Sequence, residues 1–177
     1  VSGKGTKVAD IESGWYLDHQ DLPSGIDVVA GRNYEGQAHG AAVLGILVAK
    51  ADGVGIVGVA PAARALAVSH VRSDVDAYAY GWAIHQAARK LEPGDVVLIE
   101  AERWVKHGGK QVAAPVESLE EVRDVIAWAT EDRDLIVIEP AGNGILDLKT
   151  WRLFAGHSEA IMVGACLNKD QNRSHHG

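Results

Sequence analysis

The sequence predicts an α/β fold built on a mostly parallel sheet, and the order of its apolar stretches indicates this class. Short apolar runs of strand length alternate along the chain with longer stretches of helical character. Strands that alternate with helices pair in parallel, because each intervening helix carries the chain back across the sheet in a right-handed crossover. We find no internal repeat, linker or low-complexity tract, so we expect a single domain over residues 1–177.

Six segments have the composition of strands. The pattern is clearest at residues 95–100, where four consecutive aliphatic residues indicate a strand buried on both faces. The other strands are predicted at residues 6–11, 26–30, 64–71, 135–138 and 159–165. Residues 101–115, with two adjacent glycines near their centre, are expected to be irregular.

Three stretches predict helices. Residues 41–49 are apolar nearly all round, which indicates a buried helix that begins near His39 and ends near Lys50. Residues 74–91 start with acidic and end with basic side chains, as the helix dipole favours, and proline follows. Residues 117–130 carry one apolar stripe at helical spacing.

Composition narrows the range of partners. The formal net charge of −7 argues against a nucleic-acid backbone as a partner. No apolar run approaches the ~20 residues of a membrane span, so we expect no membrane partner. The single cysteine, Cys166, excludes an internal disulfide and leaves the compartment open.

Three potential catalytic groups come from separate parts of the chain. Asp10 and Glu12 end the first predicted strand on the same side, His39 begins a helix, and Asn143 follows a strand between glycines. In parallel sheets such groups meet at the carboxyl ends of the strands. A carboxylate, a histidine and an amide donor are parts of an acyl-transfer site. Each also has a structural explanation: a turn-capping carboxylate, an inert histidine at a helix start, and an asparagine in a tight turn.

Five motifs, in order, resemble those of the subtilisin-like serine peptidases. They resemble the family's acid motif with its following loop, its histidine motif, its Gly-Val-Ala-Pro segment, its oxyanion-hole motif and the strand after it. In this chain they are Lys7–Gly14 with His19–Leu22, His39–Gly45, Gly55–Ala63, Ala141–Gly144 and Ala160–Ala165.

The resemblance implies a three-layer fold with helices on both faces of the sheet, and peptide-bond hydrolysis through an acyl-enzyme. It makes Glu12 the triad acid, with Asp10 in reserve, His39 the general base and Asn143 the oxyanion donor. Substrate-binding positions are Glu100, Ala101, Glu102 and Gly142. Two carboxylates on that wall suggest the hypothesis that a basic substrate side chain is favoured.

The chain departs from the family pattern at three points. Glu12 stands where the family has aspartate, and Ala41 stands where it has threonine. The Gly-Thr-Ser-x-Ala segment of the nucleophile is absent, and Ser174 lies in a stretch that resembles one preceding that segment. We therefore expect a C-terminally incomplete domain whose nucleophile comes from outside this chain. Part of its core would be exposed, so it should associate with the remainder of the domain or with another copy.

The alternative function is a catalytically inactive module that binds a peptide or protein in the same cleft. This alternative is favoured by Glu12, Ala41 and the missing serine. The peptidase is favoured by His39 and Asn143, because each lies within a motif that resembles the family's. The resemblance also favours a secreted protein over a cytoplasmic one, and the compartment stays unknown.

No cofactor is required by this chemistry, and no metal site is predicted. Family members often bind structural calcium, but the acidic residues here are too dispersed to locate a site. A zinc site from His157, Cys166, His175 and His176 is disfavoured, because their spacing fits no ligand pattern. Residues 53–58 match GxGxxG, yet they follow a helix and precede Pro61, which argues against a dinucleotide site.

Overall fold

A six-stranded sheet forms the centre of the computed structural model, which describes residues 2–148 and 158–165. Every neighbouring pair of its strands is parallel. In chain order the strands are β1 (Lys7–Glu12), β2 (Asp27–Ala30), β3 (Arg64–Ser69), β6 (Val96–Ile99), β9 (Ile136–Pro140) and β10 (Ile161–Val163). The predicted α/β class with a mostly parallel sheet is confirmed.

The strand order across the sheet is β10-β9-β6-β1-β3-β2, which places β1 at the point where the order reverses. The chain runs from β1 to β3 on one side of β1 and later returns to place β6 on its other side. The carboxyl ends of two strands at such a reversal border a crevice, because their connections leave in opposite directions. The ends of β1 and β6, at Glu12 and Ile99, are therefore where a site is expected.

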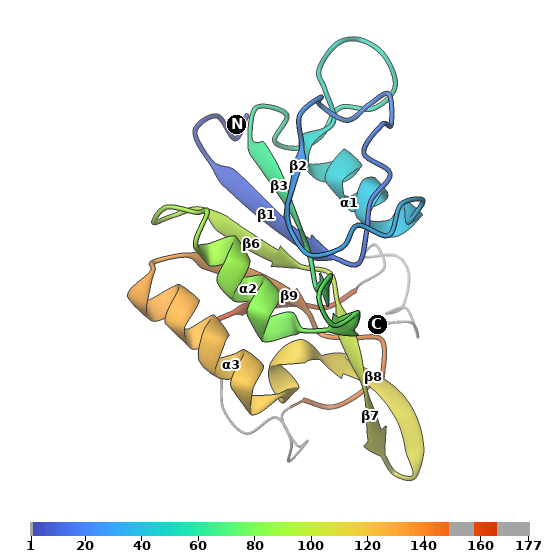
Figure 1. Cartoon of the computed structure of the whole chain (residues 1–177), viewed down its shortest axis with the longest axis vertical. Coiled ribbons are helices and arrows are strands. Elements are labelled where there is room, and N and C mark those ends of the chain that lie inside the picture. Colours follow the sequence, from blue (N-terminus) through green and yellow to red (C-terminus); the bar gives the residue numbers. More distant parts are fainter. Residues whose placement is uncertain (1, 149–157, 166–177) are drawn as a thin grey trace, which may run out of the picture.

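Helices cover both faces of the sheet (Figure 1). Helix α1 (Ala38–Val48) lies on one face, and α2 (Tyr80–Ala88) and α3 (Glu120–Ala127) lie together on the other. Two short helical segments flank α3: the 3-10 turn η1 (Val116–Ser118) and the π-helical turn η2 (Trp128–Asp132). This confirms the predicted three-layer arrangement.

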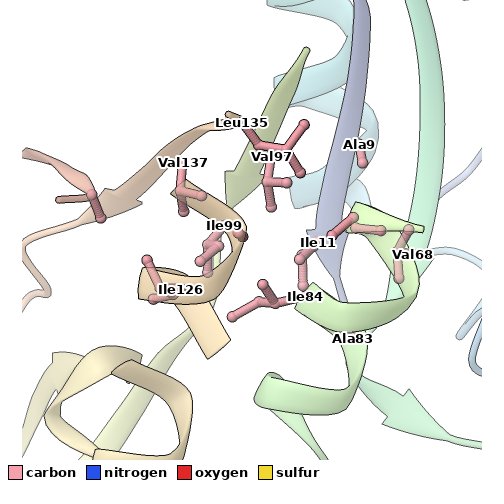
Figure 2. Close-up of a cluster of buried hydrophobic side chains, with 14 of the residues drawn as sticks. Ala9, Ile11, Val68, Ala83, Ile84, Val97, Ile99, Ile126, Leu135 and Val137 are labelled. Atoms are coloured by element: carbon pink, nitrogen blue, oxygen red, sulfur yellow. The ribbon is translucent and has the colours of Figure 1, made fainter. Parts of the chain in front are cut away.

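The larger of the two main cores lies between the sheet and helices α2 and α3. Figure 2 shows alternate residues of the central strands, among them Ile11, Val97 and Ile99, facing Ile84 of α2 and Ile126 of α3. All five side chains are at most 2% exposed. The intervening strand residues face α1, where Leu44 and Val48 pack against Val8, Ala65 and Ala67. Because β1 is packed on both faces and β6 is buried on one face and half-buried on the other, the positions of their carboxyl ends are fixed by packing.

Three sequence-based assignments need correction. Residues 101–115 are mostly not irregular: they form an antiparallel hairpin, β7 (Glu102–His107) and β8 (Lys110–Pro115), which projects from the sheet in Figure 1. Helix α2 begins at Tyr80 rather than at residue 74, because β4 (Val71–Arg72) and β5 (Ala77–Tyr78) form a small hairpin first. The helix predicted over 117–130 divides into η1, α3 and η2.

One part of the sheet carries apolar side chains that are exposed or half-buried, which we call the apolar strip: Ile136, Ile138, Pro140, Ile161 and Val163. Ile161 pairs with Ile138 and Val163 pairs with Pro140, so these residues share a face. That face is opposite to Val137, which packs with α3 in the core. Among the described residues, Ile136, Ile161 and Val163 are 42%, 54% and 51% exposed. Within the described ranges, no helix is long and apolar enough to cross a membrane.

Candidate active site

Glu12 and His39 meet at the carboxyl end of β1. The side chain of Glu12 is 13% exposed and that of His39 is 66% exposed, and His39 Nδ1 lies 2.8 Å from Glu12 Oε2. Helix α1 can bring His39 so close because residue 40 is glycine: a Cβ there would lie 2.6 Å from the Trp15 ring and 2.7 Å from the Gly14 carbonyl. Engagement of Nδ1 by the carboxylate leaves Nε2 as the ring nitrogen that can accept a proton.

A second carboxyl group reaches the same ring nitrogen. Oε2 of Glu100, the residue after β6, lies 2.9 Å from His39 Nδ1, and its side chain is only 4% exposed. The backbone N–H of Glu100 donates to the Ile11 carbonyl at 3.0 Å, which holds the residue beside the end of β1. The hydrogen-bond geometry of Nδ1 favours Glu12, so Glu100 is a close neighbour of the ring rather than its main acceptor.

Asp10, the predicted reserve acid, lies deeper. Its side chain is fully buried, and Oδ2 accepts a 2.7 Å hydrogen bond from the Trp15 indole N–H. Burial is the main cause that raises the pKa of Asp10, and its carboxyl adjoins that of Glu100. Glu12, not Asp10, is the carboxylate bonded to His39 in the structure, so the longer glutamate does reach the histidine.

The carboxyl groups at this site differ in their charge. Burial alone would raise the pKa of Glu12, but contacts from His70, Ser13 and His39 outweigh it and lower the pKa to about 2. Glu12 is therefore ionised at neutral pH. Burial and the neighbouring carboxyl of Asp10 raise the pKa of Glu100 to about 11, so Glu100 carries a proton under the same conditions.

His70 is a part of this site that the sequence analysis missed. It follows β3, is 5% exposed, and packs against the rings of Tyr78 and Tyr80 at centroid distances of 5.3 and 5.1 Å. Its Nε2 is 3.8 Å from Glu12 Oε1, which also accepts hydrogen bonds from the backbone N–H and hydroxyl of Ser13. The signal was available: a histidine directly after the carboxyl end of the strand next to β1.

Asn143 follows β9 and is exposed, with its donors directed at Glu102. The backbone N–H and the side-chain Nδ2 of Asn143 both donate to Glu102 Oε2, at 3.1 and 2.9 Å. Gly142 has a φ of +83°, a left-handed conformation that favours glycine and turns the chain toward Asn143. The amide expected to face an oxyanion is thus occupied by a carboxylate in this structure.

Glu12, His39, His70, Glu100 and Asn143 border one pocket of about 630 Å³, whereas the deeper Asp10 does not line it. Its polar lining includes Glu12, His39, Glu100, Glu102 and Asn143. Its apolar walls come from Leu98, Ile99, Ala101, Trp104, Ile138, Pro140 and Val163. A pocket of this size with convergent polar groups at the carboxyl ends of strands is the expected form of a binding or catalytic site.

A separate pair of buried carboxyl groups lies beside the pocket. Glu139, on β9, is fully buried, and Glu117, on η1, is 1% exposed. The Ser158 hydroxyl donates to Glu117 Oε2. Burial, together with the like charge of Glu117, raises the pKa of Glu139 to about 9. This pair is not predictable from the sequence, because its members lie on elements that only the tertiary fold brings together.

The predicted site residues Glu12, His39, Asn143, Glu100, Ala101, Glu102 and Gly142 all lie at or next to this pocket. Glu100 was expected to face a substrate, but its side chain lies against His39 instead of presenting a free carboxylate to the cleft. His157, Cys166, Ser174, His175 and His176 lie outside the described residues.

Known proteins resemble this chain in sequence and in fold. No family model matches the chain. In sequence the chain is 29% identical, over 187 aligned positions, to an intracellular serine protease of Paenibacillus polymyxa; the match covers 97% of this chain and 52% of that protein. The chain thus spans about half the length of the curated relative it matches.

Two solved structures share the fold. The self-cleaved protease domain of PatA superposes with a TM-score of 0.64 at 13% identity, over 99% of this chain and 63% of that one. Fervidolysin from Fervidobacterium pennivorans, described as a keratinolytic enzyme related to subtilisin, superposes with a TM-score of 0.54 at 21% identity, over 80% of this chain and 22% of that one.

Proposed function

Since this chain is related to the subtilisin-like serine peptidases in both sequence and fold, we propose that it supplies the acid, base and oxyanion donor of a serine endopeptidase. The observation that carries the proposal is the 2.8 Å contact between His39 Nδ1 and the ionised Glu12, in a pocket that also contains Asn143. A charged carboxylate on Nδ1 orients the ring and stabilises its protonated form. The other ring nitrogen can then act as a general base.

The proposed reaction is peptide-bond hydrolysis through an acyl-enzyme. A serine hydroxyl attacks the scissile carbonyl carbon while Nε2 of His39 takes its proton, and the Asn143 amide donates to the developing oxyanion. His39 then gives that proton to the amine nitrogen as the C–N bond breaks, which leaves a serine ester. A water molecule activated by the same nitrogen hydrolyses the ester and regenerates the serine.

The nucleophile in this proposal comes from outside this chain, because the sequence contains no Gly-Thr-Ser-x-Ala segment. The apolar strip supports the same idea. Its side chains lie on the α1 face of β9 and β10 and are exposed or half-buried within the described part of the chain. We therefore propose that the remainder of the domain, or failing that a second copy, covers this strip.

Glu102 bears on two questions: which substrate side chain the pocket prefers, and whether the chain takes part in cleavage or only binds a peptide. As a carboxylate on the pocket wall it would favour a basic substrate side chain. However, it also holds both donors of Asn143, which must be released before they can stabilise an oxyanion. That occupied amide favours the second candidate, a module that binds a peptide in this cleft without cleaving it.

A serine-directed fluorophosphonate tests the proposal on two proteins: this chain, and this chain continued into its natural C-terminal sequence. We expect intact-mass labelling only in the continued protein, on a serine outside residues 1–177. His39→Ala should slow the labelling about 10²–10⁴-fold. His85→Ala removes another exposed histidine, in α2, and should leave the rate unchanged.

Peptides with Arg or Leu before the scissile bond test cleavage and substrate class in the same proteins. Faster cleavage after Arg is expected, and equal rates would refute the basic preference. A folded, continued protein that neither reacts with the probe nor cleaves peptides would refute the peptidase and leave the binding module.

A further inference from the structure

The second carboxyl group beside His39 has no role in the proposed peptidase reaction. Only one carboxylate is needed to orient the ring, and Glu12 fulfils that role. Glu100 nevertheless lies 2.9 Å from the same Nδ1 atom, from the neighbouring strand end. Its presence there requires another explanation.

The three side chains converge as the ligands of a metal ion would. One atom from each of Glu12, His39 and Glu100 lies within 4.8 Å of the other two. Two ligands of a tetrahedral ion at about 2.1 Å stand about 3.4 Å apart, so the observed spacing needs only small rotamer adjustments. One imidazole nitrogen with two carboxylate oxygens is a donor set that suits Zn²⁺.

The buried carboxyl group of Glu100 gives independent evidence for a cation at this site. Its side chain is 96% buried, since it is 4% exposed, yet neither oxygen accepts a hydrogen bond from an N–H group of the described residues. Buried carboxyl oxygens are ordinarily satisfied by donors or by a cation. Oε2 lies 2.9 Å from His39 Nδ1, in the same cluster of potential ligand atoms as a carboxylate oxygen of Glu12.

The surrounding contacts already hold two of the ligands in place. Glu12 Oε1 accepts the backbone N–H of Ser13 at 2.6 Å, which leaves Oε2 for the ion. Asp10 adjoins Glu100 and is itself held by the Trp15 indole at 2.7 Å. Hydrogen bonds of this kind orient metal ligands and raise their affinity. His39, 66% exposed, leaves the site open to solvent for entry of an ion.

We propose that Glu12, His39 and Glu100 form a Zn²⁺ site in which the ion replaces the proton on Nδ1 and so blocks His39. The proton on Nδ1 and the proton of the Glu100 carboxyl both pass to solvent when the ion binds. Zinc binding does not depend on the peptidase proposal; only the consequence that zinc inhibits the base rests on it. A continued protein that binds zinc, but cleaves no peptide once the zinc has been removed, would therefore refute the peptidase and leave this site intact.

Isothermal titration with ZnSO₄ tests the site on a chain carrying Cys166→Ser, His175→Ala and His176→Ala, which removes competing ligands near the C-terminus. We expect one ion per chain. Glu100→Gln should weaken binding about 10–100-fold, the loss typical of an altered metal environment. Glu102→Gln removes a carboxylate from the same pocket and should change the affinity less than about twofold.

His39→Ala provides a second test at an exposed position that tolerates truncation. It should abolish the stoichiometric zinc signal and the visible absorption bands of bound Co²⁺, while circular dichroism stays unchanged. The proposal is overturned if the background chain takes up no zinc, if Glu100→Gln and Glu102→Gln bind equally well, or if binding survives His39→Ala. In those cases a proton shared between Asp10 and Glu100 accounts for the buried carboxyl.

Discussion

At the scale of single residues, Glu139 gives the stability of this protein a predictable dependence on pH. Its pKa is raised to about 9, whereas an unfolded glutamate titrates near 4.3. Between these values the folded state holds a proton that the unfolded state has lost, so stability falls as pH rises from about 4.5 to 9. Glu139→Gln mimics the protonated form and removes this loss.

We therefore expect the Tm of Glu139→Gln to be near that of the unsubstituted chain at pH 5 and clearly higher at pH 8. The gap can grow by at most about 1.4 kcal/mol per pH unit, and each kcal/mol corresponds to roughly 2–4 °C. Glu121→Gln, on the exposed side of α3, is the matched control and should give a pH-independent difference. A constant gap for Glu139→Gln would contradict the raised pKa.

At the scale of elements, the loop that carries Asn143 is positioned by close contact with the β7–β8 hairpin. A Cβ at Gly144 would collide with the carbonyl oxygen of Ala113 on β8. Gly144→Ala must push the loop away from the hairpin and disturb the Asn143–Glu102 hydrogen bonds. We expect urea titration to show a loss of about 1–3 kcal/mol in the free energy of unfolding.

Gly164→Ala is the control, because a Cβ there meets no described atom within 4 Å. Its free energy of unfolding should change by less than about 0.5 kcal/mol. If both variants lose the same stability, the loop is not held by the hairpin and the position of Asn143 has another cause.

The same elements show where sequence reasoning succeeds. Buried strands such as β6 were predictable, because a sheet covered on both faces demands consecutive aliphatic residues. The β7–β8 hairpin was missed although Gly108 and Gly109, both with positive φ, form its turn. Its strands carry many exposed polar residues, and packing against the rest of the fold, not local pattern, decides their pairing.

In the candidate active site, the residues were predictable from the sequence but their contacts were not. Glu12, His39 and Asn143 could be found because each lies in a motif at an element end. Their contacts could not be read from the chain. The approach of Glu100 to His39 follows from the pairing of β6 with β1, and the capture of Asn143 by Glu102 joins residues 41 positions apart.

At the scale of the whole molecule, the sheet is covered unevenly. Helices α2 and α3 seal one face, whereas α1 packs over the β1–β3 half of the other face. The apolar strip on β9 and β10 is the part of that face which stays exposed within the described residues. Exposed apolar surface of this kind promotes association, since burying it removes it from water at about 25 cal/mol per Å².

We expect this chain alone to self-associate and to bind a hydrophobic dye, with the strip as the contact surface. Ile161→Lys places a charge in the strip and should shift sedimentation toward the monomer and reduce dye fluorescence. Val75→Lys is a matched control: Val75 is 58% exposed against 54% for Ile161, but lies in the turn between β4 and β5. If both substitutions act equally, or the unsubstituted chain is a monomer that binds no dye, the strip is not an association surface. Association of the unsubstituted chain that Ile161→Lys alone abolishes would identify the strip as the surface through which this chain associates.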